Sequence, residues 1–510
     1  MKKTVFIAVI ISFLNIPLVY SGNWNSKKPI TSKNLSDKEK LETFLKIADS
    51  IREKLNVPGV GISIIKDNKV LYSGGLGYSN LSENKKVDGN TLFSIGSCTK
   101  SFTGVLTAKL VEKGLLDWHK PLKSYITNLK LKEQYIEDNL TVLDALSHGT
   151  GLAKNTAAWK YKNYTRDKLL GLLAQQDFST AFRASYNYNN MMFAIGGLAS
   201  EKVTGESWET LIKNEIFEPM QMNDSYTRFD EFIVHDNRAI GYQKDGFTVA
   251  QPVDVTVIAP TGAISSTPID MSKWLSFFAN NGQHNNTVLL QPKSYDFIAK
   301  PHKNVSVRNG DEIWYYYAGI GGFLKNGKRN IGHNGAIDGQ NSRMVIRPEE
   351  GFAIMIMTNQ LSEYKELIVN YAEEWFLEGT LTRQYERELG LEAVMHSYVI
   401  ESLLDKGKTL EAINYTKKLD ENRLGLILEA NINVLGYFYM QNGKLDEALT
   451  VFKLNAEKFP NSTNVFNSLG EAYYQKKTYQ LALEAFETSL KHDPNNQSSK
   501  DFITRIKNKN

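Results

Sequence analysis

The chain has 510 residues, of which 42% are apolar and 11% aromatic, so it is too long for one average domain and apolar enough to bury a large core. We therefore expect a globular protein of two or three domains. Lysine and arginine number 60 against 56 for aspartate and glutamate, and this near balance does not favour nucleic acid or an anionic membrane as the main partner.

Residues 1–22 predict a secretory signal peptide. Two lysines precede an apolar run from Val5 to about Leu14, and the small residues Ser21 and Gly22 follow, which is the order typical of such segments. The run is short for a bilayer span, although an uncleaved N-terminal anchor is the alternative interpretation. We therefore expect an exported protein, periplasmic or extracellular, with no stable membrane insertion after signal cleavage.

A hairpin and then a helix are predicted next along the chain. The stretch VPGVGISIIKDNKVLYSGGLGYSN alternates apolar residues on either side of Asp67 and Asn68, which is typical of two strands joined by a tight turn. Between Ser97 and Glu112 the apolar residues recur at helical spacing, and Gly114 ends the run. Ser97 therefore lies near the N-terminus of a helix.

Ser97 and Lys100 form a candidate nucleophile and base. A serine hydroxyl is a weak nucleophile until a base takes its proton, and a lysine three residues later lies on the same helix face. The lysine can accept that proton only when it is neutral, which burial and the positive end of a helix dipole favour. The spacing alone is not diagnostic, because it recurs at Ser63 with Lys66, Ser82 with Lys85 and Ser362 with Lys365.

Cys98, beside this serine, is the only cysteine of the chain. An exported protein with one cysteine has no internal disulfide, so its stability must come from its core. We interpret Cys98 as a small buried apolar residue. A catalytic thiol is the alternative, but no histidine lies nearby in the sequence.

Strands are predicted again after a long mixed segment. From Trp118 to about Lys300, helical runs alternate with turns rich in glycine and proline; strand patterning returns near YYYAGIGGFL, RNIGHNGAIDGQNSRMVIRP and GFAIMIMTNQ, and a helix is predicted from about Glu363 to Phe376. Strands at both ends with helices between them indicate an α+β fold in which the terminal strands share one sheet.

Beyond about Arg383 the sequence predicts helix pairs with an internal repeat. Glycine, alanine, phenylalanine and proline each recur 34 residues apart, at Gly436 and Gly470, Ala448 and Ala482, Phe452 and Phe486, and Pro460 and Pro494. A weaker unit contains Gly407 and Ala412. The period resembles that of the tetratricopeptide repeat, and its aromatic residues are interpreted as helix-packing core.

Three motifs occur in the order and rough spacing of the penicillin-recognising serine hydrolases. They are FSIGSCTKSFTG from Phe93, YNN at residues 188–190 and GHNGAIDGQNS from Gly332. The chain resembles the class C β-lactamase, DD-peptidase and esterase branch of that family, with further similarity at LSHGTGL, GGLASEKVTG, APTGAISSTPIDM and MVIRPEEGFAIMIMTN. The resemblance covers roughly residues 50 to 375. It implies a β-lactamase/transpeptidase-like fold, with an antiparallel sheet flanked by helices and an all-helical region.

The resemblance also implies roles for individual residues. Ser97 would be the acylated nucleophile, Lys100 its activating partner and Tyr188 a proton shuttle, with a phenol pKa lowered by a neighbouring lysine charge. Asn190 would hold the substrate amide and help fix Lys100. The backbone N–H groups of Ser97 and Ala336 would form the oxyanion hole. His333, Asn334 and Gly335 would line the substrate site beside them.

Three residue patterns depart from the family. Asn334 stands where the third motif usually has a hydroxyl, which weakens the expected recognition of a substrate carboxylate. His333 stands in place of lysine and removes a fixed positive charge at neutral pH, as in the peptidase and esterase branches. HGTG replaces the more usual HTSG, which we interpret as a change in a structural turn.

We expect three segments: a signal peptide over residues 1–22, a serine hydrolase domain over 23–382 and a tetratricopeptide-like helical domain over 383–510. The predicted reaction is cleavage of amide or ester bonds in a small-molecule or peptide substrate through an acyl-enzyme. No cofactor, metal or nucleic acid is expected. A peptidase or esterase is favoured over a β-lactamase acting on penicillins. A non-catalytic penicillin sensor, or a module that binds a protein partner through its helical repeats, is the alternative from another class.

Overall fold

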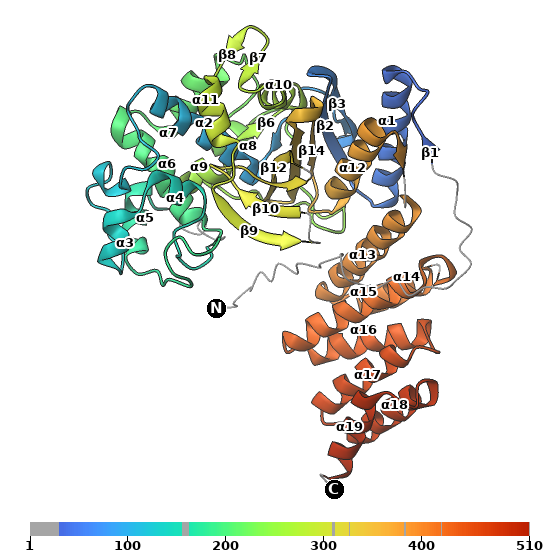
Figure 1. The fold of residues 1–510 in the computed structure, drawn as a ribbon. Coiled ribbons are helices and arrows are strands. Elements are labelled where there is room, and N and C mark those ends of the chain that lie inside the picture. The colour runs from blue at the N-terminus through green and yellow to red at the C-terminus, as the bar shows by residue number, and fades with distance from the viewer. Residues whose placement is uncertain are drawn as a thin grey trace.

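The structure is a computed structural model, and it describes residues 30–155, 163–308, 312–325, 327–381, 384–419 and 421–508. The predicted signal peptide and the predicted domain boundary between residues 382 and 383 lie outside these ranges. Figure 1 shows a body of sheet and helices, from which a column of helices extends to the C-terminus. Within the described residues, no helix is both long and apolar enough to cross a bilayer.

An antiparallel sheet forms the centre of the body. Among the described residues it has nine strands in the order β4-β3-β2-β14-β13-β12-β11-β10-β9. In chain order their bounds are β2 Gly59–Lys66, β3 Lys69–Asn80, β4 Lys85–Lys86, β9 Lys303–Arg308, β10 Glu312–Tyr316, β11 Gly321–Lys325, β12 Lys328–Ile337, β13 Gln340–Arg347 and β14 Phe352–Thr358. The predicted hairpin is confirmed, with Asp67 and Asn68 in the left-handed region at its turn. The pairing of β2 with β14 confirms that the terminal strands share one sheet.

Helices cover both faces of this sheet. Alternate side chains of a strand point to opposite faces, so Ile354 and Ile356 of β14 pack with α1 (Asp37–Lys54) and α12 (Tyr364–Glu373), while Met355 of the same strand faces the larger core. That larger core contains α2 (Thr99–Glu112), α6 (Asn190–Thr204) and α10 (Pro268–Ala279). Helix α2 is buried on almost all sides, which suits a helix that carries site residues into the interior.

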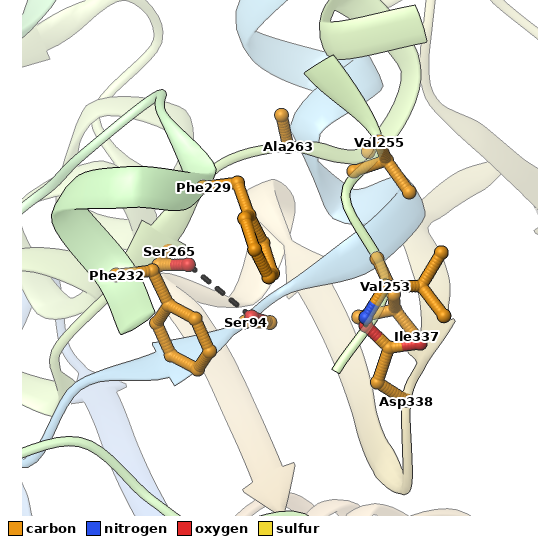
Figure 2. A pocket seen from close by; sticks show the side chains of 10 residues that line it. Ser94, Phe229, Phe232, Val253, Val255, Ala263, Ser265, Ile337 and Asp338 are labelled. Atoms are coloured by element: carbon orange, nitrogen blue, oxygen red, sulfur yellow. Dashed lines mark hydrogen bonds between the residues drawn. The ribbon is translucent and has the colours of Figure 1, made fainter. Parts of the chain in front are cut away.

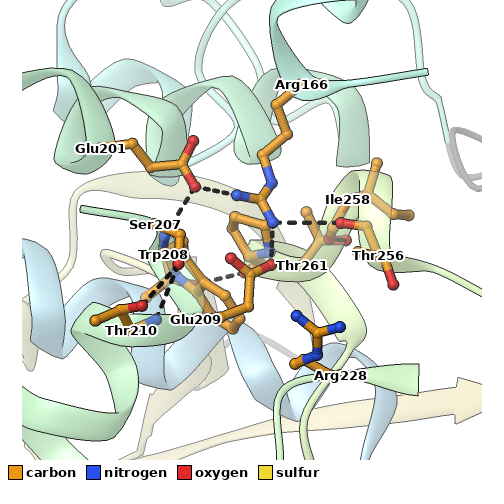
Figure 3. A network of polar contacts seen from close by, with 12 residues as sticks. Arg166, Glu201, Ser207, Trp208, Glu209, Thr210, Arg228, Thr256, Ile258 and Thr261 are labelled. Atoms are coloured by element: carbon orange, nitrogen blue, oxygen red, sulfur yellow. Dashed lines mark hydrogen bonds and ion pairs between the residues drawn. The ribbon is translucent and has the colours of Figure 1, made fainter. Parts of the chain in front are cut away.

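The helical part of the body lies beside the sheet. Its other helices include α3 Gln134–Asn139, α4 Val142–Leu146, α5 Arg166–Leu173, α7 Trp208–Ile212, α8 Phe229–Ile233, α9 Ala259–Gly262 and α11 Pro292–Ile298. Arg166 joins three of its segments, because its guanidinium binds the carboxylates of Glu201 on α6 and Glu209 on α7 and donates to the carbonyl of Thr256 (Figure 3). This network fixes the segment that leads into α9.

The C-terminal column consists of helix pairs. Its helices are α13 Gln384–Asp405, α14 Thr409–Lys417, α15 Glu421–Gln441, α16 Leu445–Lys458, α17 Thr463–Gln475, α18 Tyr479–His492 and α19 Gln497–Lys507. Gly436 on α15 lies against the ring of Phe452 on α16, and 34 residues later Gly470 on α17 lies against Phe486 on α18. The period therefore marks equivalent helix contacts, while the tetratricopeptide assignment itself stays a prediction.

Candidate active site

Ser97, Lys100 and Tyr188 meet in the folded chain. Ser97 lies in the short 3-10 helix η1 (Gly96–Cys98), which runs directly into α2, so Lys100 follows one turn later. The Nζ atom of Lys100 is 3.0 Å from Ser97 Oγ, and the phenol of Tyr188 donates a hydrogen bond of 2.9 Å to the same oxygen. Ser97 is half-buried whereas Lys100 is fully buried, so the hydroxyl is the reachable end of the cluster.

Burial favours the neutral form of Lys100. Loss of solvation lowers the pKa of its amine well below the ordinary value of 10.5. The amine also hydrogen-bonds the carbonyl of Thr261, at 2.8 Å. A neutral amine held between that carbonyl and Ser97 Oγ has a lone pair available for the serine proton, which is the property that a base requires.

The pKa of Tyr188 is raised, and the expectation that a lysine charge lowers it is wrong. Burial disfavours the phenolate and raises the pKa of the phenol above 10, although the hydrogen bond with Ser97 opposes this shift. The expected lowering required a charged lysine, whereas the same burial favours neutral Lys100. Tyr188 therefore stays a protonated phenol, which donates to Ser97 Oγ and does not act as the resting base.

His333 is a neutral member of the site. It is buried on β12, where Nε2 lies 2.9 Å from the hydroxyl of Tyr316 and Nδ1 lies 2.6 Å from the carbonyl of Asn334. These partners assign the proton to Nδ1 and make Nε2 the acceptor. Burial, and then the proximity of Lys100, lower the pKa of His333 to about 3. His333 thus brings no positive charge to the cleft at neutral pH.

The side chain of Asn334 leaves this cluster. As the next residue on β12 it points to the opposite face of the strand, where it is exposed and hydrogen-bonds Glu366 of α12. Asn190, which opens α6 two residues after Tyr188, donates its N–H to the carbonyl of Asn155 at 2.7 Å. The ring of His333 contacts the Ser97 cluster through Tyr188, with the two ring centroids 6.3 Å apart.

The backbones of η1 and β12 are in direct contact at the predicted oxyanion hole. A Cβ on Gly96 would lie 2.7 Å from the backbone nitrogen of Ala336, and a Cβ on Gly335 would lie 2.0 Å from the carbonyl oxygen of Ile95. Glycine at both positions lets the two segments approach. Strand β11 pairs with β12 only as far as Gly332, so among the described strands this edge is open from His333 to Ile337. This unpaired stretch contains Ala336, whose backbone nitrogen lies beside Gly96, the residue before Ser97.

A small apolar pocket adjoins these backbones. Its volume is about 20 Å³, and it is lined by Ser94, Phe229, Phe232, Val253, Val255, Gly262, Ala263, Ser265, Ile337 and Asp338. Figure 2 shows the rings of Phe229 and Phe232 on one side of Ser94, and Ile337 with Asp338 on the other. Burial raises the pKa of Asp338 to about 6. The pocket lies next to the segments that carry Ser97 and Ala336.

Sequence reasoning missed four contributors to the site. They are the carbonyl of Thr261 and the side chains of Tyr316, Tyr186 and His148. The motifs LSHGTGL and APTGAISSTPIDM contain His148 and Thr261, so their resemblance to the family was the available signal, although it gave them no role. Tyr186 and Tyr316 stand in tyrosine-rich runs in which no single residue is distinctive.

The comparisons with known proteins agree with this architecture. The family model described as Beta-lactamase matches residues 46–375. Protein flp of Staphylococcus aureus strain N315 is 24% identical over 369 residues, which are 70% of this chain and 72% of its own. Unguisins hydrolase ungD' of Aspergillus campestris is 23% identical over 335 residues, covering 62% and 61% of the two chains. The octameric penicillin-binding protein homologue from Pyrococcus abyssi superposes with a TM-score of 0.58 at 25% identity and covers 67% of this chain and 78% of its own.

Proposed function

Because the chain belongs to the beta-lactamase family, we propose that it is a serine hydrolase that cleaves ester or amide bonds through an acyl-enzyme on Ser97. The observation that carries this proposal is the position of Ser97 Oγ, 3.0 Å from the amine of Lys100 and 2.9 Å from the phenol of Tyr188. Burial of the amine supplies a base, and the half-buried hydroxyl supplies a nucleophile that a substrate can reach.

In the proposed acylation, Ser97 Oγ attacks the substrate carbonyl carbon while Lys100 takes the hydroxyl proton. The N–H groups of Ser97 and Ala336 stabilise the oxyanion, and one such donor is typically worth roughly 3 kcal/mol. Tyr188 gives its phenolic proton to the leaving oxygen or nitrogen as the bond to the acyl carbon breaks, and it regains a proton from Lys100. Water then attacks the acyl-enzyme by the reverse proton path and releases the acid.

We propose esters and peptides as substrates in preference to penicillins. Neutral His333 offers no fixed cation for a substrate carboxylate, and Asn334 directs its side chain to Glu366 on the far face of the strand. Backbone groups of the unpaired stretch of β12 can bind an uncharged acyl group without a cation at position 333 or the side chain of Asn334. Two similar proteins, an unguisins hydrolase and a penicillin-binding protein homologue, have names that are compatible with hydrolysis at this fold. Because residues 1–22 predict a signal peptide, we also propose that the protein is exported.

Active-site labelling tests the proposal. The protein is incubated separately with a fluorescent fluorophosphonate and a fluorescent penicillin, beside the variants Ser97→Ala and Ser82→Ala. Ser82 is the matched control, because it is exposed and also has a lysine three residues later. We expect fluorophosphonate labelling in the wild type and in Ser82→Ala, and none in Ser97→Ala.

The penicillin separates the candidate activities. Strong labelling by penicillin that is lost in Ser97→Ala would favour β-lactam recognition over the ester and peptide preference. An unlabelled wild type whose biological effect survives in Ser97→Ala would overturn the hydrolase and favour the binding module. Hydrolysis rates on simple esters, D-amino-acid peptides and a chromogenic cephalosporin then rank the substrates.

A further inference from the structure

The turn formed by residues 146–152 lies directly behind Tyr188. Its third residue, His148, is buried and adopts a left-handed backbone conformation with φ of 59°. The carbonyl of His148 accepts the N–H of Asn187 at 3.0 Å, and its Nδ1 accepts the N–H of Asn189 at 3.2 Å. One residue therefore binds the backbone on both sides of Tyr188.

The ring of His148 also packs on the phenol itself. Its centroid is 4.4 Å from the ring centroid of Tyr188 and 4.8 Å from that of Tyr316, the residue that hydrogen-bonds His333. Phe193 on α6 lies against the same imidazole at 5.4 Å. The imidazole of His148 therefore packs among the rings of Tyr188, Tyr316 and Phe193.

His148 is suited to hold the segment around Tyr188 in place and is not suited to carry a proton. Because Nδ1 accepts a backbone N–H, the neutral ring carries its proton on Nε2, and Nε2 has no hydrogen-bond partner among the described residues. Burial, and then nearby Lys100, lower the pKa of His148 well below 6.5, so the ring stays uncharged at neutral pH. Asn155 also holds the segment around residues 187–189, because its N–H donates to the carbonyl of Tyr188 at 3.1 Å.

We propose that His148 is a positioning residue that holds the phenol of Tyr188 at hydrogen-bond distance from Ser97 Oγ, through the Asn189 N–H to Nδ1 bond and the ring contact. This inference rests on the proposed function, because it assigns a support for the residue that carries protons in that reaction. The geometry of proton transfer is sensitive to displacements of about 1 Å, so a shift of the segment around residues 187–189 lowers turnover without removing a reacting group.

Two substitutions separate the hydrogen bond from the backbone turn. His148→Gly suits the positive φ and removes both the ring and the acceptor, while His148→Asn also tolerates this conformation and keeps an acceptor near the Nδ1 position. On a neutral ester we expect His148→Gly to lower kcat by about tenfold or more with KM changed less than twofold. We expect the fall in log kcat in His148→Asn to be at most half of the fall in His148→Gly.

A double-mutant cycle with Tyr188→Phe shows whether His148→Gly lowers kcat through the phenol of Tyr188. If His148 acts through the phenol, His148→Gly should change the residual activity of Tyr188→Phe by less than twofold, because the group that it positions is already absent. Equal losses in the two backgrounds would overturn the proposal, since they would indicate a general structural role. Wild-type kcat in both His148 variants would overturn it as well.

A crystal structure of His148→Gly tests the placement independently of activity. We expect Tyr188 Oη to lie outside hydrogen-bond distance of Ser97 Oγ in the variant, and an unmoved phenol would overturn the proposal. The wild-type labelling experiment on Ser97 tests the hydrolase function on its own. Failure of the positioning role and failure of the function are therefore distinguishable.

Discussion

Burial decides the protonation state of the residues around Ser97. It lowers the pKa of Lys100 and of His333 and raises the pKa of Tyr188, so each of the three favours its neutral form. A charge arises in this cluster only when the proton of Ser97 moves to Lys100. In the proposed reaction this charge therefore develops together with the oxyanion, which the backbone N–H groups of Ser97 and Ala336 are predicted to stabilise.

The assignment of Lys100 as the base predicts a loss of activity in Lys100→Arg, because a guanidinium stays protonated at any accessible pH. We expect kcat/KM to fall by roughly 10²- to 10⁴-fold. In the wild type, activity should rise with pH through the pKa of Lys100, at a midpoint below 10.5. Steady-state kinetics on a neutral ester across pH measure both effects. Lys113→Arg, beyond the end of the same helix, is the control, and more than a tenth of wild-type activity in Lys100→Arg would contradict the assignment.

Buried His333 predicts a loss of stability in acid. His333 binds a proton below about pH 6.5 in the unfolded chain but only below about 3 in the folded one. Between these values the unfolded state holds more protons, so the free energy of unfolding falls as pH falls, by up to about 1.4 kcal/mol per pH unit. Urea unfolding at pH 7, 6 and 5 should show a shallower pH dependence in His333→Gln than in the wild type. Parallel curves for the two proteins would exclude this contribution.

At the scale of elements, secondary structure decides which serine and lysine can act together. Ser63 and Lys66 have the same spacing as Ser97 and Lys100, but they lie on β2, where residues three apart point to opposite faces. Ser63 Oγ donates to the carbonyl of Pro268 at 2.6 Å, whereas Lys66 Nζ binds the carboxylate of Asp67 at 2.6 Å. On β2 the same spacing therefore leaves the serine and the lysine with separate partners.

The contact between η1 and β12 predicts a specific effect of Gly96→Ala. The new Cβ would lie 2.7 Å from the backbone nitrogen of Ala336, so it would push apart the two segments that are predicted to supply the oxyanion hole. We expect kcat/KM to fall by about 100-fold, as for the loss of one oxyanion donor.

Gly114→Ala is the matched control for Gly96→Ala. Gly114 follows α2 and also has a positive φ, of 70°, but a Cβ there would meet nothing within 4 Å. It should cost about 1 kcal/mol in the free energy of unfolding and leave kinetics unchanged. Kinetics and urea unfolding of both variants provide the measurement, and an equal loss of activity in the two would refute the contact.

The sequence allowed prediction of the elements, and of the meeting of Ser97 with Lys100 and Tyr188, better than of the residues that hold them in place. Apolar periodicity gave the hairpin at Asp67 and the helix after Ser97, because burial of one face repeats with the period of the element. The role of Thr261 lies in a backbone carbonyl, which leaves no side-chain signal. The pKa of Tyr188 depends on burial by distant segments, so the chemistry of neighbouring residues predicted the wrong direction.

At the scale of the whole molecule, the helical column docks on a loop that also supports the active-site sheet. Asp245 accepts hydrogen bonds from Ser402 Oγ on α13 at 2.9 Å and from Nζ of Lys406, the residue after α13, at 3.3 Å. At the other end of the loop, the N–H of Val253 donates to Asp338, two residues beyond Ala336 on the β12 to β13 turn. One loop therefore contacts both the first helix of the column and the turn that follows β12.

This junction predicts coupled unfolding of the hydrolase body and the helical column. Removing the two column donors in Ser402→Ala/Lys406→Gln leaves the bonds that Asp245 accepts within its own loop, from the N–H groups of Phe247 and Thr248. We expect the variant to unfold in two separated calorimetric transitions where the wild type shows one, because hydrogen bonds between the loop and the column are lost while each core persists.

Asp245→Asn should act on both sides of the loop. The amide cannot accept the full set of bonds that the carboxylate receives from Thr248 and α13, so the turn beside Ala336 loses support as well. We expect this variant to show the separated transitions together with a lower kcat, whereas Ser402→Ala/Lys406→Gln should retain wild-type kcat. A single unshifted transition in both variants would show that the column and the body are stabilised through other contacts.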